Sequence, residues 1–344
     1  MKASTKILLI SAGIITVSGL IVTFIGAALG GGIKSSVSAS ENYEEAKYDF
    51  TNSVKYLEIK EASHDIEIKL SEDDKAHVIC YNSDRYKHDV ELNGDTLKIS
   101  VQTKKFNEPQ ITWNIGYEIN VKTTVFLPQG QYDELLVNAS SANLSTDPSL
   151  GFNKTTVTLT SGDVIYSSPV SGNASFTTSS GNVSVRDISP SDLTISCTSG
   201  DVNCENINAS GRITIGTSSG EITLEDIICS DLNLKSTSGD VEGKDITTSK
   251  ALECEASSGN FKVSSLTCDS IAVERTSGDI TIDGLTISSA SSLKTSSGEV
   301  EVNTLVDVYV DGDSSSGDRD VDSSKTGVDL TINTSSGDVD VTRR

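Results

Sequence analysis

The stretch LTISCTSGDV at residues 193–202 is one copy of a phrase that returns from the middle of the chain to its end. Each copy carries Ser-Gly followed by an acidic or amide residue and, in most copies, a β-branched residue. The glycine recurs every 19 or 20 residues, at Gly162, Gly181, Gly200, Gly220, Gly239, Gly259, Gly278, Gly298, Gly317 and Gly337. A period this regular indicates a solenoid, in which one supersecondary unit is stacked on copies of itself.

Apolar residues within each copy alternate with Ser, Thr, Asn and Asp, which is the pattern of a strand with one buried face. They form columns: Val202, Ile222 and Val241 two places after the glycine, Ile195 and Ile215 five before it, and a column seven after it that ends at Leu305. The sequence therefore predicts an all-β, single-chain parallel β-solenoid with coils of 19–20 residues.

Each coil is expected to hold two short strands joined by the Ser-Gly corner, where glycine supplies a positive φ and the Asp or Asn beside it bonds its own backbone. Successive coils should then pair as parallel strands about 4.8 Å apart. The corner alternates between two versions, so one turn could instead take two units; five inward columns per unit already enclose a core, which favours one unit per turn.

The amino-terminal segment has the features of a membrane anchor. Residues 7–29 contain no charge and are long enough to cross a bilayer as one helix. Because Lys2 and Lys6 precede this segment, the amino terminus is expected in the cytoplasm and the repeats outside the cell membrane, in a single-pass arrangement. The expected divisions are a transmembrane anchor over 1–33, with a signal peptide as the alternative, and a linker over 34–52.

An irregular β cap with the first coils is expected over 53–141, and the regular solenoid over 142–344. Leu57, Ile59, Ile66 and Ile68 already follow the spacing of the repeat, with His64 where glycine later stands. Asn93-Gly94-Asp95 between two strand candidates predicts a hairpin turn. A cap is expected because the exposed end of a solenoid would offer unpaired backbone to other chains.

Charge and composition exclude some classes of function. The net charge of −22 excludes a general nucleic-acid binder, which needs a basic face. A sugar-cleaving β-helix needs paired carboxylates beside aromatic platforms, and the repeats hold few aromatics. We therefore expect no enzyme activity and no cofactor, with a carbohydrate-active enzyme as the least favoured alternative. An ice-binding solenoid needs a flat, unbroken ladder of threonines, and here the ladder is interrupted at Asn233–Lys235, so this function is not expected.

Metal ligation has only weak candidates. The acidic residues beside the glycines could attract calcium, but solvent-facing turn caps are the favoured interpretation. The densest acidic run contains Asp311, Asp313, Asp318 and Asp320, which lack the spacing of an EF-hand loop and more simply indicate a solvated terminal coil. The three histidines, His64, His77 and His88, show no recognisable metal spacing, and we expect them to contact solvent or the cap.

Six cysteines give no Cys-x-x-Cys motif, so metal or redox use is not expected. Cys204 and Cys254 fall in apolar columns, where cysteine serves as a small hydrophobe. Cys229 and Cys268 share a register two units apart, which places them about 10 Å apart and too far for a disulfide if one unit makes one turn.

The repeats at 193–202 and 232–241, the amino-terminal anchor and Phe126-Leu127-Pro128 before the array together resemble the putative-adhesin β-strand-repeat family of bacterial cell-surface proteins. The resemblance covers about residues 46–344. It implies a β-solenoid at a bacterial envelope, with a Gram-positive organism favoured, and brings no catalytic residues. The expected function is a membrane-anchored, non-catalytic surface or adhesion module that binds an envelope polymer or protein. The alternative is a structural or regulatory scaffold for a membrane partner.

Overall fold

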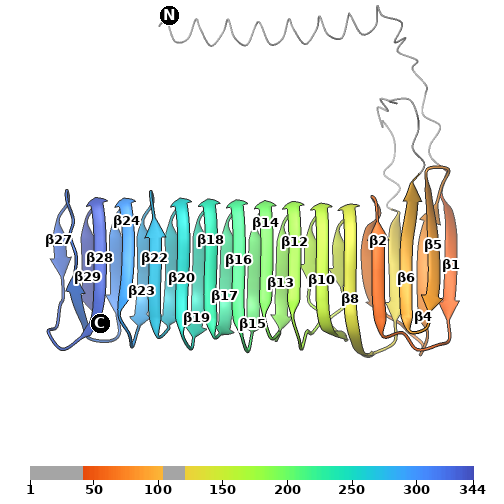
Figure 1. Cartoon of the computed structure of the whole chain (residues 1–344), viewed down its shortest axis with the longest axis horizontal. Coiled ribbons are helices and arrows are strands. Elements are labelled where there is room, and N and C mark those ends of the chain that lie inside the picture. Colours follow the sequence, from red (N-terminus) through yellow and green to blue (C-terminus); the bar gives the residue numbers. More distant parts are fainter. Residues whose placement is uncertain (1–41, 104–120) are drawn as a thin grey trace, which may run out of the picture. The chain divides into compact units, whose positions relative to one another are not determined.

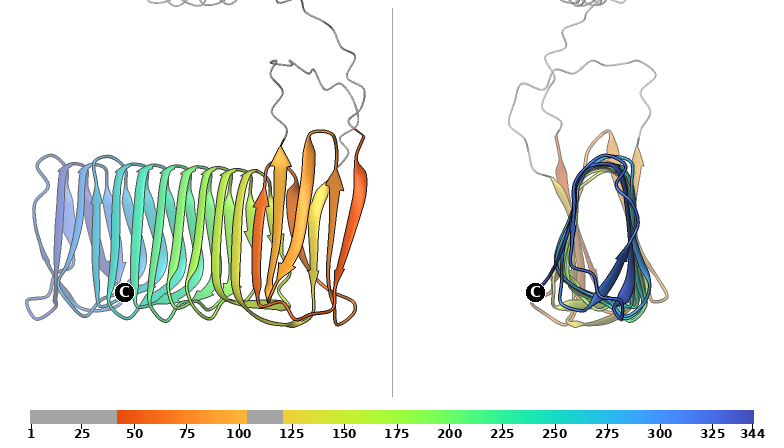
Figure 2. Two further views of the ribbon diagram at one scale, coloured as in Figure 1. Left: turned by 45° about the vertical axis from the view of Figure 1, so that its right-hand side comes forward. Right: turned by 90° about the vertical axis from the view of Figure 1, so that its left-hand side faces the viewer.

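Each repeat forms two short strands that face one another across a narrow core. The computed structural model describes residues 42–103 and 121–344. Of these, residues 43–103 and 121–344 belong to one compact unit in which the coils lie side by side (Figure 1). Seen along the stacking axis, successive coils superimpose (Figure 2).

The strands of the described residues form two sheets. Sheet A contains, from edge to edge, β1 (Glu44–Phe50), β4 (Ala76–Asn82), β7 (Lys122–Leu127), β3 (Asp65–Leu70), β9 (Leu144–Thr146), β11 (Val164–Tyr166), β13 (Val183–Ile188), β15 (Val202–Asn208), β17 (Ile222–Cys229), β19 (Val241–Thr248), β21 (Phe261–Thr267), β23 (Ile280–Thr286), β25 (Val300–Thr304), β29 (Val339–Arg343) and β27 (Arg319–Val321). Sheet B contains, in the opposite direction, β26 (Val308–Asp311), β28 (Val328–Ser336), β24 (Ser291–Ser297), β22 (Ser270–Arg275), β20 (Ala251–Ser258), β18 (Asp231–Ser238), β16 (Arg212–Ser219), β14 (Leu193–Ser199), β12 (Ala174–Ser180), β10 (Leu150–Ser161), β8 (Gly130–Ser141), β2 (Tyr56–Glu61), β6 (Thr96–Thr103) and β5 (Tyr86–Asn93).

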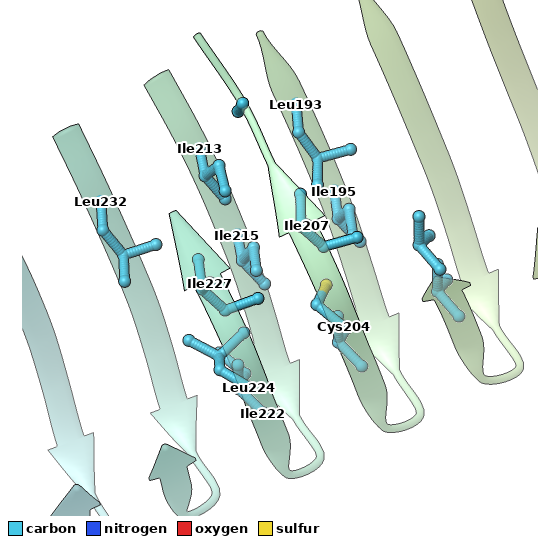
Figure 3. Packing of buried hydrophobic residues seen from close by; sticks show 14 of the residues in the cluster. Leu193, Ile195, Cys204, Ile207, Ile213, Ile215, Ile222, Leu224, Ile227 and Leu232 are labelled. Carbon is cyan, nitrogen blue, oxygen red and sulfur yellow. The ribbon is translucent and has the colours of Figure 1, made fainter. Parts of the chain in front are cut away.

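The register confirms one repeat per turn. Val202 pairs with Ile222, and Ile222 pairs with Val241, all in parallel strands. In sheet B, Ile195 pairs with Ile215 in the same way. These side chains point inward, as Figure 3 shows for the coils around β14–β17, and each is at most 1% exposed. The predicted columns are therefore the hydrophobic core.

Glycine at the corner is required for two reasons. The ten corner glycines have φ between +106° and +154°, which confirms the predicted positive φ. In addition, a Cβ built on any of them would lie 1.9–2.3 Å from the carbonyl oxygen of the adjacent coil's corner residue. The close approach of backbones was not predicted, and it forbids any side chain at this position.

The sequence led us to expect that the Asp or Asn after the glycine bonds its own backbone, and this expectation was wrong. Instead its side-chain oxygen accepts a hydrogen bond from the backbone N–H of the equivalent residue in the next coil. Asp201 Oδ1, for example, accepts from Glu221 N at 2.9 Å, and Asn182 Oδ1 accepts from Asp201 N at 2.8 Å. The reason is geometric, because the corner turns this N–H along the stacking axis, where the neighbouring side chain supplies the acceptor.

A second left-handed position, which the sequence analysis missed, lies six residues after the glycine. Asp187, Asn206, Asp226, Asp245 and Ser265 have φ between 53° and 57° there. This residue is skipped in the pairing, so the next aliphatic side chain turns back to the core.

The coil that follows Gly298 lacks this irregularity, and the predicted apolar column fails there. Leu285 pairs with Thr304, one position earlier than the repeat requires. Thr304 is consequently buried, whereas Leu305 is 49% exposed. A one-residue change of register reverses which side chain faces the core.

The cap differs from the expectation at its outer edge. The segment Glu44–Phe50 lies in the predicted linker 34–52 but forms strand β1. Its backbone pairs antiparallel with β4, and alternate side chains are half-buried. The hairpin at Asn93–Asp95 is confirmed by the antiparallel β5–β6 pair and by a φ of +66° at Gly94. The first coil, β2–β3, lies inside the stack, because β6 and β7 pair on its outer side.

The carboxyl-terminal end also departs from chain order. The coil β28–β29 lies between β24–β25 and β26–β27. The last segment of the chain therefore forms the penultimate coil of the stack, and the segment that precedes it in sequence forms the edge coil. The edge coil carries Gly312 and Arg319 in columns that are apolar elsewhere, and residues 311–327 are exposed or only half-buried. This agrees with the predicted solvated terminal coil.

The predicted membrane segment 7–29 lies outside the described residues. Within residues 42–103 and 121–344, no helix is long and apolar enough to span a bilayer.

Candidate functional site

The most regular surface feature is a column of hydroxyl side chains two places before each corner glycine, which we name the hydroxyl ladder. Its members all belong to sheet B or to the turn that follows it, and all are exposed: Thr160, Ser179, Thr198, Ser218, Thr237, Ser257, Thr276, Ser296, Ser315 and Ser335. The adjacent position is serine in all ten copies as well. Parallel pairing places successive rungs about 4.8 Å apart.

A shallow groove of about 620 Å³ runs beside this ladder across β14, β16, β18, β20 and β22. Alternate outward side chains line it, with the hydroxyl ladder on one side and Ser196, Gly216, Lys235, Glu255 and Glu274 on the other. The strand backbone between these rows forms its floor, because intervening side chains such as Cys197 and Thr217 point into the core.

The charge of the groove changes along its length. The side opposite the ladder is uncharged at Ser196 and Gly216 and then carries Lys235, Glu255 and Glu274. Lys235 Nζ lies 3.1 Å from Glu255 Oε2, with both side chains largely exposed. A Cβ at Gly216 would meet nothing within 4 Å, so the groove is open at this point.

The four predicted metal candidates lie in the edge coil. Asp311, Asp313, Asp318 and Asp320 are exposed there. Asp311 Oδ1 accepts a hydrogen bond from Gly312 N, and the Asp318 N–H donates to Asp338 Oδ1. In the part of the chain that the structure describes, these carboxylates do not form a group of three converging ligand atoms.

One such group does exist, inside the cap: Glu61, His64 and His88 offer ligand atoms that all lie within 4.8 Å of one another. Glu61 ends β2, His64 lies in the corner between β2 and β3, and His88 lies in β5. The three residues are 5%, 3% and 7% exposed.

Hydrogen bonds hold Glu61 and His88 in place. His88 Nε2 lies 3.0 Å from Glu61 Oε2, and its Nδ1 lies 3.1 Å from Asn82 Oδ1. Glu61 Oε2 also accepts from the Thr123 hydroxyl at 2.9 Å, and Glu61 Oε1 accepts from Ala62 N at 2.8 Å. Burial opposes ionisation of Glu61, but its interaction with His88 and the hydrogen bonds from Ala62 N and the Thr123 hydroxyl together outweigh burial, so the pKa of the Glu61 carboxyl is lowered.

Aromatic rings surround His64. Its ring stacks on that of His88 with centroids 5.3 Å apart, and Tyr86 and Tyr43 approach it edge-on at 5.1 Å and 5.8 Å. Its Nδ1 lies 3.8 Å from Glu61 Oε1. His64 and His88 thus contact the cap, as expected, whereas His77 lies apart from them and bonds to Asp49 and Asp73.

Sequence reasoning missed this cluster because the three residues have no motif spacing. A signal was present, however, in the repeat itself. Glu61 pairs with Ala139 in a column that continues through Leu159 and Thr178, and His64 occupies the glycine position of its coil. Glu61 and His64 therefore mark the site, because the repeat fills their positions with small or apolar residues in other coils.

The six cysteines are all buried, and none forms a disulfide. Cys229 pairs with Thr248 of the adjacent coil, so Cys268 is two coils away, as predicted. Burial raises the pKa of Cys204 and of Cys229 to about 12. Thiols held in this form are poor nucleophiles.

Comparison with known proteins places the chain in the Toastrack DUF4097 family, which matches residues 54–243 and 225–344. The chain belongs to this family, and the resemblance to a β-strand-repeat family of surface proteins is confirmed. No curated protein matches the chain in sequence.

Three crystal structures are similar to it. A putative adhesin from Bacteroides fragilis is 14% identical, with 87% of this chain and 97% of that chain covered and a TM-score of 0.30. A putative lipid binding protein from Parabacteroides distasonis is 17% identical, with 76% and 94% covered and a TM-score of 0.37. A putative cell adhesion protein from Clostridium sporogenes is 8% identical, with 88% and 100% covered and a TM-score of 0.18.

Proposed function

We propose that the protein is a non-catalytic surface module, anchored in the cell membrane through residues 7–29, that binds a hydroxyl-rich envelope polymer along the groove beside the hydroxyl ladder. The observation that carries this proposal is the ladder itself, which repeats an exposed Ser or Thr in each of the ten coils that have a corner glycine.

The fold alone does not explain this uniformity. The row across the groove accepts Lys235, Glu255 and Glu274, so this face of sheet B tolerates charged side chains. A hydroxyl can both donate and accept hydrogen bonds, and rows of hydroxyls at a constant spacing suit a ligand that is itself a repeating chain of hydroxyl groups. Many weak contacts along a polymer add to a useful affinity because each later contact is intramolecular.

The charge of the chain favours the same ligand class. With a net charge of −22, an acidic polymer would be repelled, whereas a neutral polysaccharide pays no such cost. The groove is shallow and open, which suits a long ligand lying along the surface better than a small molecule, since small molecules are enclosed in deeper pockets.

The test is sedimentation of the full-length chain, in detergent micelles, with insoluble neutral cell-wall polysaccharide. Gly216→Tyr places a ring in the groove where a side chain meets no obstacle, and Thr223→Tyr in the same coil adds the same ring to the outer face of sheet A. We expect Gly216→Tyr to weaken binding at least tenfold and Thr223→Tyr to leave it unchanged. Equal binding by both variants would show that the polymer does not bind in the groove.

A scaffold for a membrane partner would give a different result. The full-length chain would then co-purify with one membrane protein through residues 1–45, and neither tyrosine variant would alter that association.

A further inference from the structure

We propose that Glu61, His64 and His88 form a binding site for a transition-metal ion, with Zn²⁺ as the best match, that ties together the cap of the solenoid. This inference is independent of the proposed polymer binding, because the site lies inside the cap and not on the outer face of sheet B.

The distances between ligand atoms are close to those that a tetrahedral ion requires. Zn²⁺ with bonds of about 2.0–2.1 Å requires its ligand atoms to be about 3.3 Å apart. Glu61 Oε2 lies 3.0 Å from His88 Nε2, and Glu61 Oε1 lies 3.8 Å from His64 Nδ1. The ligand atoms of all three residues lie within 4.8 Å of one another, so rotation of the side chains, that of the stacked His64 ring above all, is needed to bring them to bonding distance of one ion. A fourth position would then remain for another ligand.

Neighbouring residues form the hydrogen bonds that usually orient the side chains of metal ligands. A ligating histidine normally donates its second ring N–H to an oxygen acceptor, which orients the ring. Asn82 Oδ1 does this for His88, because it lies 3.1 Å from Nδ1 and is itself fixed by the backbone N–H of His88 at 2.7 Å. The Thr123 hydroxyl and the Ala62 N–H orient the Glu61 carboxylate by donating hydrogen bonds to its two oxygens.

The repeat does not require a carboxylate at the position of Glu61. In other coils the Glu61 column is filled by Ala139, Leu159 or Thr178, and a buried ion pair is often no more stabilising than apolar residues of equal volume. The cap is also the place where a cross-link is most useful, since Glu61, His64 and His88 come from β2, its corner and β5, which a bound ion would join. Stability would then depend on the ion, as it does in other proteins with structural metal sites.

The ligand set selects the class of metal. Two imidazole nitrogens and one carboxylate oxygen suit Zn²⁺ and its neighbours, whereas Ca²⁺ and Mg²⁺ prefer oxygen ligands only. The same three ligand types, two His and one Glu, hold zinc in known proteins.

The test uses the full-length chain carrying an affinity tag without histidine, stripped with a chelator. Zn²⁺ is added to the folded protein and, in a parallel sample, during refolding, because the site is enclosed. Bound metal is measured by mass spectrometry, affinity by competition with a coloured chelator, and coordination by the visible absorption of Co²⁺ in place of Zn²⁺. The variants are Glu61→Gln, which keeps the shape and one of the two acceptor oxygens, and His64→Ala, with His77→Ala as the matched control outside the cluster.

We expect one Zn²⁺ per chain in the wild type and in His77→Ala, a tetrahedral Co²⁺ spectrum, a higher unfolding temperature with metal, and no competition by Ca²⁺. Loss of a ligand should weaken binding by at least the 10–100-fold typical of lost outer partners. If the wild type binds no Zn²⁺ by either route, or if Glu61→Gln and His64→Ala bind it as tightly as the wild type, the assignment is wrong. The wild-type result decides the matter even if one variant does not fold.

Discussion

Replacement of a corner glycine in the middle of the array is the sharpest test of the stacking geometry. In Gly220→Ala, the new Cβ would lie 2.0 Å from the carbonyl oxygen of Gly200, at a residue whose φ is +150°. The matched control is Gly216→Ala, four residues earlier in the same coil, where a Cβ meets nothing within 4 Å. Both variants add one methyl group, so they differ only in backbone conformation and space.

The magnitude follows from two contributions. A non-glycine residue in this region of φ costs about 1–3 kcal/mol. Relief of the clash requires the corner to move, which breaks or weakens the hydrogen bonds from Gly220 N to Ser238 O and from Gly200 N to Ser219 O, each worth about 0.5–1.5 kcal/mol. The expected loss is therefore about 2–6 kcal/mol, whereas Gly216→Ala should be neutral or stabilise by up to about 1 kcal/mol.

Hydrogen–deuterium exchange measured by mass spectrometry suits this comparison, because a solenoid opens locally and contacts only neighbouring coils. A loss of 2 kcal/mol lowers protection by more than about tenfold. We expect faster exchange in the peptides that cover residues 200–241 of Gly220→Ala and unchanged exchange in Gly216→Ala. Equal protection in the two variants would refute the account of the corner.

Three further predictions concern other parts of the fold. Hydrogen bonds to the Asp49 and Asp73 carboxylates raise the pKa of His77, so its contribution to stability is complete below about pH 6.5 and is lost as the pH rises through the raised value; His77→Gln should remove that part of the pH dependence of thermal unfolding, and an unchanged profile would show that the contacts do not matter. Burial raises the pKa of Cys204 to about 12, and all six cysteines are buried, so iodoacetamide at pH 8 should label none of them before urea unfolds the chain; labelling of the folded protein would contradict the buried columns. Deletion of residues 328–344 removes the partners of β26 and β27, so both should lose exchange protection even though they precede the deletion in sequence; protection of these strands in the truncated chain would mean that they stack directly on β24 and β25.

The regular array was predictable because its information is local and repeated. The backbone geometry of one coil accounts for the period of 19–20 residues, the alternation of apolar and polar residues and the glycine corner. These three signals recur in each copy of the repeat. The same logic failed at Leu305, where the coil after Gly298 lacks the extra residue that the preceding coils, from β13 to β23, carry at the second left-handed position.

The sequence by itself therefore determined the class of fold, the turn length and the inward columns. Only the tertiary structure decided the order of coils at the two ends and the meeting of Glu61, His64 and His88. The physical reason is that strand periodicity specifies which side of a strand is buried, whereas the choice of neighbouring strand depends on contacts between segments far apart in the chain. At the ends the repeat no longer constrains that choice, and β5 can bring His88 against a corner that precedes it by more than twenty residues.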